Sequence, residues 1–234
     1  MEKNIKVCKK TDLYYPKKFC KESYLPEQIF YLGDISLCDS MVLGVVGKRD
    51  TSPRYLTISF QIGERLAEKG ITVLNGLAVG CDSSAVKGAL AQNGKVIAIL
   101  PCGLDMVYPR QNEGLVEEII EKGGCVISEY ACGTQPNKYR FVQRDQLQAA
   151  ISTKLFVVDA EVDGGTMHTV RYARKFGKKI GCFEDSKGLI SSGNRYMLEN
   201  RIADSIKDTA ELISFATVEQ SEGFVQMNLF EQIG

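Results

Sequence analysis

Histidine, paired cysteines and net charge are what this 234-residue sequence has least of. The only histidine is His168, and the eight cysteines form no CxxC pair, so zinc-binding spacing is absent. Eight cysteines spread over a chain of this length do not indicate a disulfide scaffold. The 29 basic and 29 acidic residues cancel, so the overall charge does not call for a nucleic-acid partner.

Long apolar stretches are also absent. The first ten residues, MEKNIKVCKK, carry charges and no apolar core of the kind a signal peptide needs. No uncharged apolar run approaches the roughly 18 residues of a membrane-spanning helix. We therefore expect a cytoplasmic protein without a membrane partner.

The charges are distributed unevenly along the chain. Between residues 138 and 179 there are nine basic and four acidic residues, whereas residues 199–234 hold two basic and seven acidic ones. The first stretch is compatible with a phosphate-facing surface. Ordinary solvated faces would give the same counts.

Short apolar runs alternate with longer amphipathic segments from residue 41 onward. This pattern predicts an α/β, extended Rossmann-like fold, in which a mostly parallel sheet carries helices on both faces. The expected strands are 41–46, 71–74, 95–100, 125–127, 155–158 and 179–183, and the expected helices are 52–69, 83–92, 112–121, 140–151 and 166–176.

The chain divides into three predicted segments. Residues 1–40 are expected to be a lead packed on the core, with a short helix from about Tyr24 to Tyr31 and a turn at Gly33-Asp34. Residues 41–214 form the Rossmann-like domain. Residues 215–234 turn acidic and lose periodicity, which predicts a loosely held tail.

The first glycine loop, Gly47-Lys48-Arg49, follows a strand and precedes a helix. Free N–H groups at the helix start can hold an anion there, and Lys48 and Arg49 add charge. The loop is not a G-x-G-x-x-G fingerprint, and no acidic residue ends the second strand at Leu74-Asn75, so we expect no dinucleotide cofactor. A glycine needed only for packing explains the loop equally well.

The second glycine loop, Gly164-Gly165-Thr166, has the same place after the strand at 155–158. Thr166 is suited to cap the next helix and to donate to a phosphate. Because loops after parallel strands emerge at one edge of the sheet, both glycine loops are expected together there. His168 lacks an evident acidic or nucleophilic partner in the sequence and is expected to be structural or solvent-facing.

The segment 138–145 interleaves cations with aromatic residues. Lys138, Arg140 and Arg144 are placed to neutralise phosphates, and Phe141 offers a ring on which bases stack. Tyr139 and Phe141 are also compatible with core positions at a helix entrance.

Six ordered motifs resemble the DNA-processing protein family DprA/Smf over nearly the whole chain. They are Gly47-Lys48-Arg49, residues 75–82 (NGLAVGCD), residues 100–105 (LPCGLD) with Tyr108-Pro109 and Asn112, Ser128-Glu129 with Gly133 and Pro136, residues 141–145 (FVQRD), and residues 163–166 (DGGT). The resemblance implies non-catalytic binding of single-stranded DNA, loading of a RecA-type recombinase during transformation or recombination, and a homodimer. By position, it assigns the DNA contacts to Arg49, Lys138, Phe141 and Arg144.

Four positions depart from the family pattern. Lys48 replaces a serine, Val79 an arginine, Val86 a histidine and Asp145 an asparagine. An aspartate that faced phosphates would repel them. Either Asp145 caps its local helix or the groove differs from the family's.

The tail holds a separate motif, in which Gln226, Leu229 and Phe230 match a short sequence that docks on the replicative sliding clamp. The same residues are compatible with folding back onto the domain.

Two alternative functions would also be served by these glycine loops. One is a nucleotide-processing enzyme of the lysine-decarboxylase-like or LOG group, although the glutamate that follows its phosphate loop is missing here. The other is a sensor with a mononucleotide in the crevice.

Overall fold

The computed structural model describes residues 4–17, 25–185 and 190–218. In chain order the elements are β1 (Lys6–Lys9), β2 (Gln28–Gly33), η2 (Ile35–Asp39), β3 (Val42–Val46), α1 (Pro53–Glu68), β4 (Thr72–Asn75), α2 (Cys81–Ala91), β5 (Val96–Leu100), η3 (Arg110–Asn112), α3 (Glu113–Glu121), β6 (Cys125–Ser128), α4 (Lys138–Ile151), β7 (Lys154–Val157), α5 (Thr166–Lys175), β8 (Ile180–Phe183), α6 (Ser192–Glu199), β9 (Asp204–Ile206) and α7 (Thr209–Thr217).

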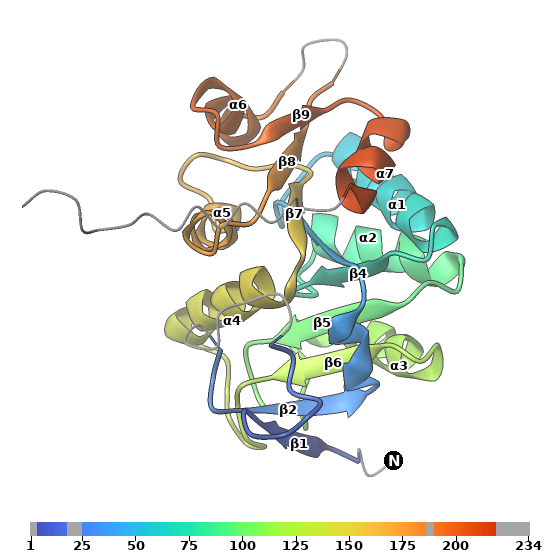
Figure 1. Ribbon diagram of the computed structural model, residues 1–234, viewed down its shortest axis with the longest axis vertical. Coiled ribbons are helices and arrows are strands. Elements are labelled where there is room, and N and C mark those ends of the chain that lie inside the picture. Colours follow the sequence, from blue (N-terminus) through green and yellow to red (C-terminus); the bar gives the residue numbers. More distant parts are fainter. Residues whose placement is uncertain (1–3, 18–24, 186–189, 219–234) are drawn as a thin grey trace, which may run out of the picture.

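One sheet runs through these residues in the order β1-β2-β6-β5-β4-β3-β7-β8-β9 (Figure 1). Strands β3 to β9 are all parallel to one another, and β1 and β2 are antiparallel additions at one edge. The connection from β6 through α4 to β7 crosses from one half of the sheet to the other, so the switch point lies between the adjacent strands β3 and β7. Such a switch point opens a crevice at the carboxyl ends of the two strands, where ligands of open α/β sheets bind.

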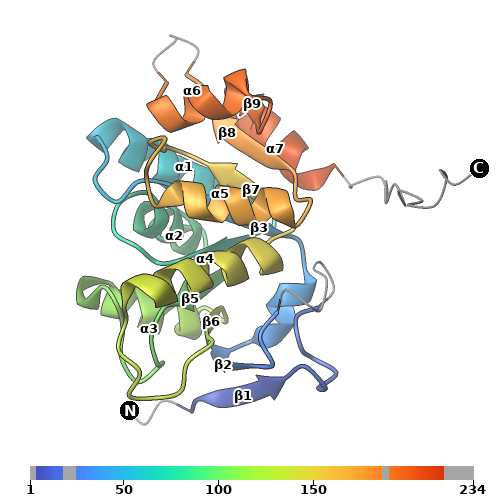
Figure 2. The ribbon, with the colours of Figure 1, turned by 90° about the vertical axis from the view of Figure 1, so that its left-hand side faces the viewer.

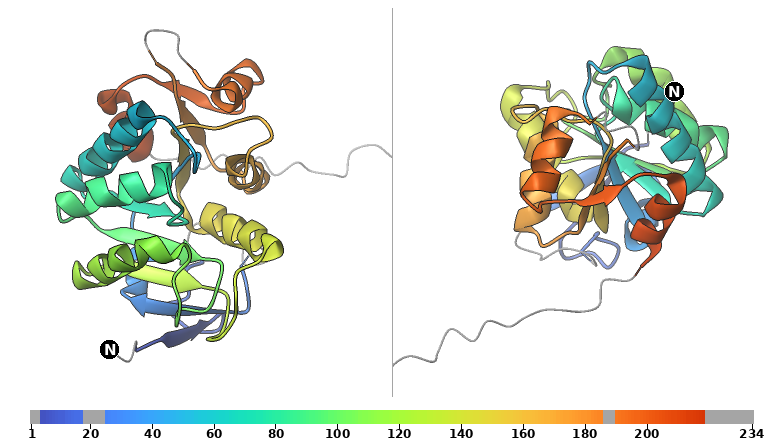
Figure 3. Two further views of the ribbon diagram at one scale, coloured as in Figure 1. Left: turned by 180° about the vertical axis from the view of Figure 1, so that it is seen from behind. Right: turned by 90° about the horizontal axis from the view of Figure 1, so that it is seen from above.

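Helices cover both faces of the sheet. Helices α1, α2, α3 and α7 lie on one face, and α4, α5 and α6 lie on the other (Figures 1 and 3). The first layer closes a core around Leu66, Ala85 and Ile119, whereas Leu147 of α4 and Val170 of α5 pack against the opposite face. Figure 2 shows α4 and α5 side by side, and both approach the switch point from this second face.

Local sequence explains the elements that lead into the crevice. All five residues of β3 are buried, as expected for a central parallel strand covered on both sides. Helix α1 starts with Pro53 at its first position, where the missing N–H costs no hydrogen bond, and buries Ile62 and Leu66 on one face. Helix α4 is capped by Asn137, whose side chain accepts from the backbone N–H of Arg140.

The structure confirms the predicted fold class. The six expected strands are β3 to β8, and the five expected helices are α1 to α5. The turn at Gly33 is also present, with a φ of 83°. The lead segment contributes β1 and β2 to the same sheet.

The predicted helix at Tyr24–Tyr31 is wrong, because residues 28–33 form strand β2. Ile29 and Leu32 are three residues apart, which suggests one face of a helix. In the structure they pack into the cores on opposite sides of the sheet. The free edge of β6 provides β2 with an antiparallel partner, a tertiary contact that local periodicity does not reveal.

The predicted boundary at residue 214 falls inside α7, which continues to Thr217. Ala216 is buried on the core, and the Nζ of Lys154 donates to the backbone carbonyl of Phe215 near the end of this helix. The rest of the expected tail, residues 219–234, lies outside the described residues. Within the described ranges, none of the helices is both long and apolar enough to cross a bilayer.

Candidate functional site

A cavity of about 590 Å³ lies at the switch point, between the loops that follow β3 and β7 and the first turns of α4 and α5. We call it the charged cavity. Nine of the ten predicted phosphate-site residues line it: Gly47, Lys48, Arg49, Lys138, Phe141, Arg144, Gly164, Gly165 and Thr166. The two glycine loops are 117 residues apart in sequence, from 47 to 164, and they meet here because β3 and β7 are adjacent parallel strands.

Arg140 is the exception among the predicted residues. Its guanidinium donates to the backbone carbonyl of Gln135 and lies 5.3 Å from the ring centroid of Tyr130. Arg140 therefore contacts the segment that precedes helix α4 and does not line the cavity.

Beside the mouth of the cavity, Arg49 and Phe141 of the lining meet a second ring, Tyr108, which is not part of the lining; we call Phe141 and Tyr108 the aromatic wall. The guanidinium carbon of the exposed Arg49 lies 4.9 Å from the ring centroid of the half-buried Phe141. The exposed Tyr108 meets the same ring edge to face, with centroids 5.4 Å apart and an interplanar angle of 66°. Tyr108 belongs to the Tyr108-Pro109 motif, but nothing in that motif indicates that its ring packs on Phe141.

Arg144 forms part of the cavity floor and is nearly inaccessible, with 5% exposure. Its Nε lies 3.0 Å from Oδ1 of Asp145, and its Nη1 donates to the carbonyl of Ile99 at 3.5 Å. The guanidinium also lies against Gly76, where an added Cβ would be only 1.2 Å from Nη1. A glycine at position 76 is therefore what gives this arginine its space.

Two buried carboxyl groups, those of Asp82 and Asp145, lie close enough to Arg144 to compensate its charge. Asp82 accepts from the backbone N–H groups of Gly76 and Ala78, at 3.2 and 3.4 Å. Burial raises the pKa of Asp82 from 3.8 to about 6, and nearby Arg144 opposes that rise. Burial likewise raises the pKa of Asp145, with Arg144 again opposing.

The role of Asp145 differs from the helix cap considered for it. Asp145 lies inside helix α4, is 9% exposed and forms an ion pair with its neighbour Arg144. The groove at this position therefore carries an internal ion pair. Asp82 belongs to the motif at residues 75–82, yet only the fold reveals that it lies close to Arg144.

Lys48 and Glu161 join the two glycine loops at the cavity mouth, with 2.5 Å between Nζ and Oε1. The half-buried His168 also lines the cavity, and its proximity opposes the rise that burial causes in the pKa of Asp145. The lining thus holds four cationic side chains, Lys48, Arg49, Lys138 and Arg144, and four acidic ones, Asp50, Asp82, Asp145 and Glu161. Two ion pairs, Lys48–Glu161 and Arg144–Asp145, account for half of these charged groups.

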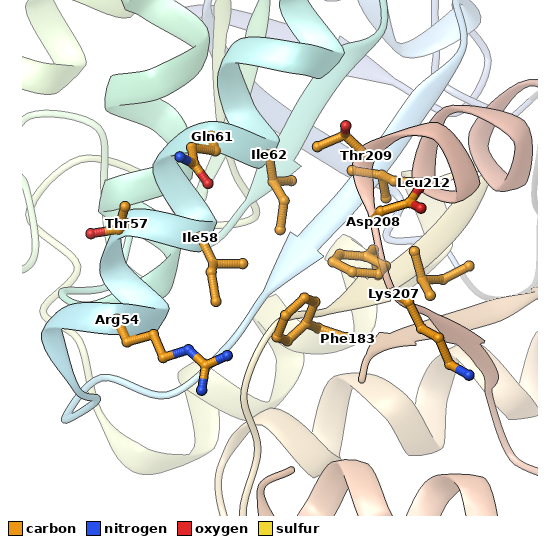
Figure 4. A pocket seen from close by; sticks show the side chains of 12 residues that line it. Arg54, Thr57, Ile58, Gln61, Ile62, Phe183, Lys207, Asp208, Thr209 and Leu212 are labelled. Carbon is orange, nitrogen blue, oxygen red and sulfur yellow. The ribbon is translucent and has the colours of Figure 1, made fainter. Parts of the chain in front are cut away.

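A second cavity, of about 520 Å³, lies on the other face of the sheet between α1, α7 and the ends of β8 and β9 (Figure 4). We call it the apolar cavity. Its floor consists of aliphatic and aromatic side chains, among them Ile58, Phe183 and Leu212, whereas Arg54 and Lys207 stand at its rim. Neither glycine loop takes part in its lining.

Among the described residues, no three histidine, cysteine, aspartate or glutamate side chains gather in a way that could hold a metal ion. Gln226, Leu229 and Phe230 of the clamp-like motif lie outside the described residues.

Comparison with known proteins places this geometry in context. The family model for DNA recombination-mediator protein A matches residues 6–217. Protein Smf of Escherichia coli (strain K12) is 32% identical over 167 residues, which cover 71% of this chain and 45% of that protein. The chain spans about half the length of the curated relatives it matches.

Solved structures agree with the sequence comparison. DNA processing protein A of Helicobacter pylori, described for its single-stranded DNA binding mode, superposes with a TM-score of 0.80 at 25% identity, over 92% of this chain and 96% of that one. DNA processing protein A of Streptococcus pneumoniae gives a TM-score of 0.80 at 26% identity, over 90% and 74% of the two chains. This chain therefore belongs to the DprA/Smf family of DNA recombination-mediator proteins.

Proposed function

We propose that this chain binds single-stranded DNA at the charged cavity and catalyses no reaction there. The observation that carries the proposal is the contact at the mouth of the cavity, where the guanidinium of Arg49 lies 4.9 Å from the ring of Phe141. A cation next to an accessible ring offers one contact to a phosphate and one to an adjacent base. The single-stranded DNA binding of the H. pylori relative supports the same class of ligand.

The phosphate contacts are assigned to the outer part of the cavity. Arg49 and Lys138 are exposed and reach it from the β3–α1 loop and the start of α4. The first turn of α5 adds backbone N–H groups at Gly165 and Thr166, which a helix leaves unused at its N-terminus. Both kinds of donor suit a phosphodiester in any sequence context.

Arg144 has a different part in this proposal. Because its guanidinium is buried between Asp145, Asp82 and Gly76, its charge is already compensated. It also lies 5.9 Å from the centroid of the Phe141 ring. We assign it to the floor, where it holds Phe141 in place and adds positive potential from beneath the strand.

The preference for a single strand follows from the aromatic wall. Phe141 and Tyr108 offer ring surface to bases, and only unpaired bases leave their faces free to stack. The absence of an evident acid–base and nucleophile set in the sequence supports a binding role over the LOG-type enzyme.

The cellular role is proposed from family membership. We infer that the chain, as a cytoplasmic homodimer without a cofactor, protects single-stranded DNA and assists a RecA-type recombinase to load on it in transformation or recombination. Recombinase assembly on a strand coated with single-strand-binding protein is expected to be faster in its presence. An unchanged assembly rate would contradict the loading role.

The clamp interaction is a separate proposal that rests on Gln226, Leu229 and Phe230. Deletion of residues 226–234 is expected to abolish capture by the sliding clamp and to leave the DNA affinity unchanged. Clamp capture that survives this deletion would remove the motif from consideration.

The principal test is fluorescence anisotropy of a labelled oligo-dT strand over a series of salt concentrations. We expect salt-sensitive binding that duplex DNA and free mononucleotides compete for poorly. Efficient competition by a mononucleotide, with little binding of the strand, would contradict the proposal. That outcome would assign the glycine loops to a nucleotide enzyme or sensor.

A further inference from the structure

The ion pair between Lys48 and Glu161 connects two loops that are 113 residues apart in sequence. It lies on the lining of the charged cavity, beside Arg49 on one loop and Gly164 on the other. The side chain of Lys48 is 27% exposed and that of Glu161 is 60% exposed. The hydrogen bond that Lys48 Nζ donates to the Glu161 carboxylate is the main reason that the pKa of Lys48 is raised.

The backbone around Lys48 is firmly held. Its N–H donates to the carbonyl of Asp159 at 3.0 Å, and its own carbonyl accepts from the N–H of Cys81 at 3.1 Å. Gly80, with a φ of 84°, packs so closely that an added Cβ would come within 2.3 Å of the Lys48 carbonyl oxygen. Lys48 therefore presents its ammonium group from a fixed position.

Glu161 has more freedom than its partner. Its backbone carbonyl accepts from the N–H of Gly164 at 2.9 Å, which forms the turn before α5. More than half of its side chain is exposed, so the carboxylate can rotate into solvent without uncovering apolar surface. Of the two charged groups, Glu161 is the one that can move aside.

A carboxylate and a phosphodiester compete for the same kind of donor, since both are oxyanions that accept from an ammonium group. We propose that Glu161 is an internal counter-ion: it occupies the anion position at Lys48 until a strand phosphate displaces it, and so lowers affinity and salt sensitivity. This inference rests on the proposed function. An exposed ion pair is weak enough for such an exchange.

The exchange has a measurable signature. In the wild type, the Lys48–phosphate contact is offset by the loss of the Lys48–Glu161 contact. In Glu161→Gln that offset is gone, so strand affinity is expected to rise about two- to fivefold. The plot of log K against log salt is expected to steepen by up to about 0.7, because in the wild type the carboxylate freed on binding takes up a cation, which offsets the counter-ion that the strand releases at Lys48.

The design uses a double-mutant cycle and a charge-matched control. Glu161→Gln is compared in the wild type and in Lys48→Gln, where its gain in affinity is expected to disappear. Glu68→Gln removes one acidic charge from another ion pair, which Glu68 forms with Arg65. Glu68 is the last residue of α1, about 20 Å along the helix from its first residue, Pro53. Glu68→Gln raises the net charge equally, but it is expected to leave the salt slope unchanged. Thermal unfolding of each variant checks that the fold is intact.

Equal tightening by Glu161→Gln and Glu68→Gln would overturn the inference, since the effect would then be one of net charge. Persistence of the full Glu161→Gln gain in Lys48→Gln would overturn it too. Inorganic pyrophosphate, titrated by NMR against the same variants, separates this failure from that of the proposed function. Tighter pyrophosphate binding by Glu161→Gln, with no strand binding by any variant, supports the counter-ion and contradicts DNA binding; unchanged pyrophosphate affinity overturns the counter-ion.

Discussion

The two cavities lie on opposite faces of one sheet and have similar volumes, about 590 and 520 Å³, but they place their charges differently. In the apolar cavity the charges stay at the rim, where Arg54 pairs with Asp185, and the floor is aliphatic and aromatic. In the charged cavity the charges reach the floor, where Asp82, Arg144 and Asp145 are each at most 9% exposed.

This difference indicates that packing shapes the floor of the apolar cavity, whereas the floor of the charged cavity is suited to binding. A buried ion cluster is not explained by stability alone, because apolar residues of similar volume are often as stabilising. The apolar floor around Ile62 and Leu212 is the arrangement that stability favours. A ligand therefore explains the charged floor better than stability does.

The largest effect is expected for the floor arginine. Arg144→Met leaves Asp82 and Asp145 buried without their cation, which should lower the free energy of unfolding by about 3–5 kcal/mol at pH 7. The same change at the exposed Arg49 removes a cation–π contact and should cost about 0.5–1 kcal/mol. Urea denaturation of both variants measures the difference; similar small losses would mean that water reaches the floor.

The next effect is a pH dependence of stability. Burial raises the pKa of Asp82 from 3.8 to about 6, so the folded state binds this proton more tightly than the unfolded chain. The resulting stabilisation is complete below about pH 3.8 and is lost as the pH rises through about 6.

Asp82→Asn removes this titration. The unfolding free energy of the wild type, relative to Asp82→Asn, should fall by about 3 kcal/mol between pH 3.8 and 7. Glu129→Gln is the comparison, because burial raises the pKa of Glu129 to about 7. The stabilisation linked to Glu129 is therefore lost at a higher pH than that linked to Asp82. A pH-independent difference between the wild type and Asp82→Asn would show that Asp82 is solvated like an exposed carboxylate.

The sequence predicted the lining of the charged cavity better than its electrostatics. Gly47 and Gly164 follow buried strands, and parallel strands bring such loops to one edge of the sheet, so their meeting was predictable. The closeness of Arg144 to Asp82 was not, because it depends on the space at Gly76 between helix α4 and the loop after β4. Arg140 lies outside the lining, because alternating cations and rings do not specify which side of a helix faces the cavity.

A moderate effect is expected for the outer arginine. Arg49→Gln should weaken strand binding about ten- to hundredfold at low salt, as for loss of a charged hydrogen bond, and flatten the salt slope by about 0.7. Arg54→Gln is the matched control, because Arg54 lies five residues further on, at the rim of the apolar cavity. Anisotropy titrations compare them; equal losses would contradict the assignment of DNA to the charged cavity.

The smallest effect concerns the aromatic wall. Tyr108 holds the Phe141 ring edge to face and leaves 42% of its own surface exposed. Tyr108→Ala should weaken strand binding about two- to tenfold, the range expected for loss of one aromatic pair. Tyr108→Phe should retain the affinity, because the ring and not the hydroxyl makes the contact.

Tyr196 on α6 is 40% exposed and, like Tyr108, does not line the charged cavity, so Tyr196→Ala controls for loss of an exposed ring. An abasic strand discriminates further, since it keeps the phosphates that Arg49 contacts and removes the bases. If Tyr108→Ala weakens abasic and normal strands equally, Tyr108 acts only by holding Phe141 and Arg49 in position. A larger loss with the normal strand makes the Tyr108 ring part of the base-binding surface, and extends that surface from the charged cavity onto the loop after β5.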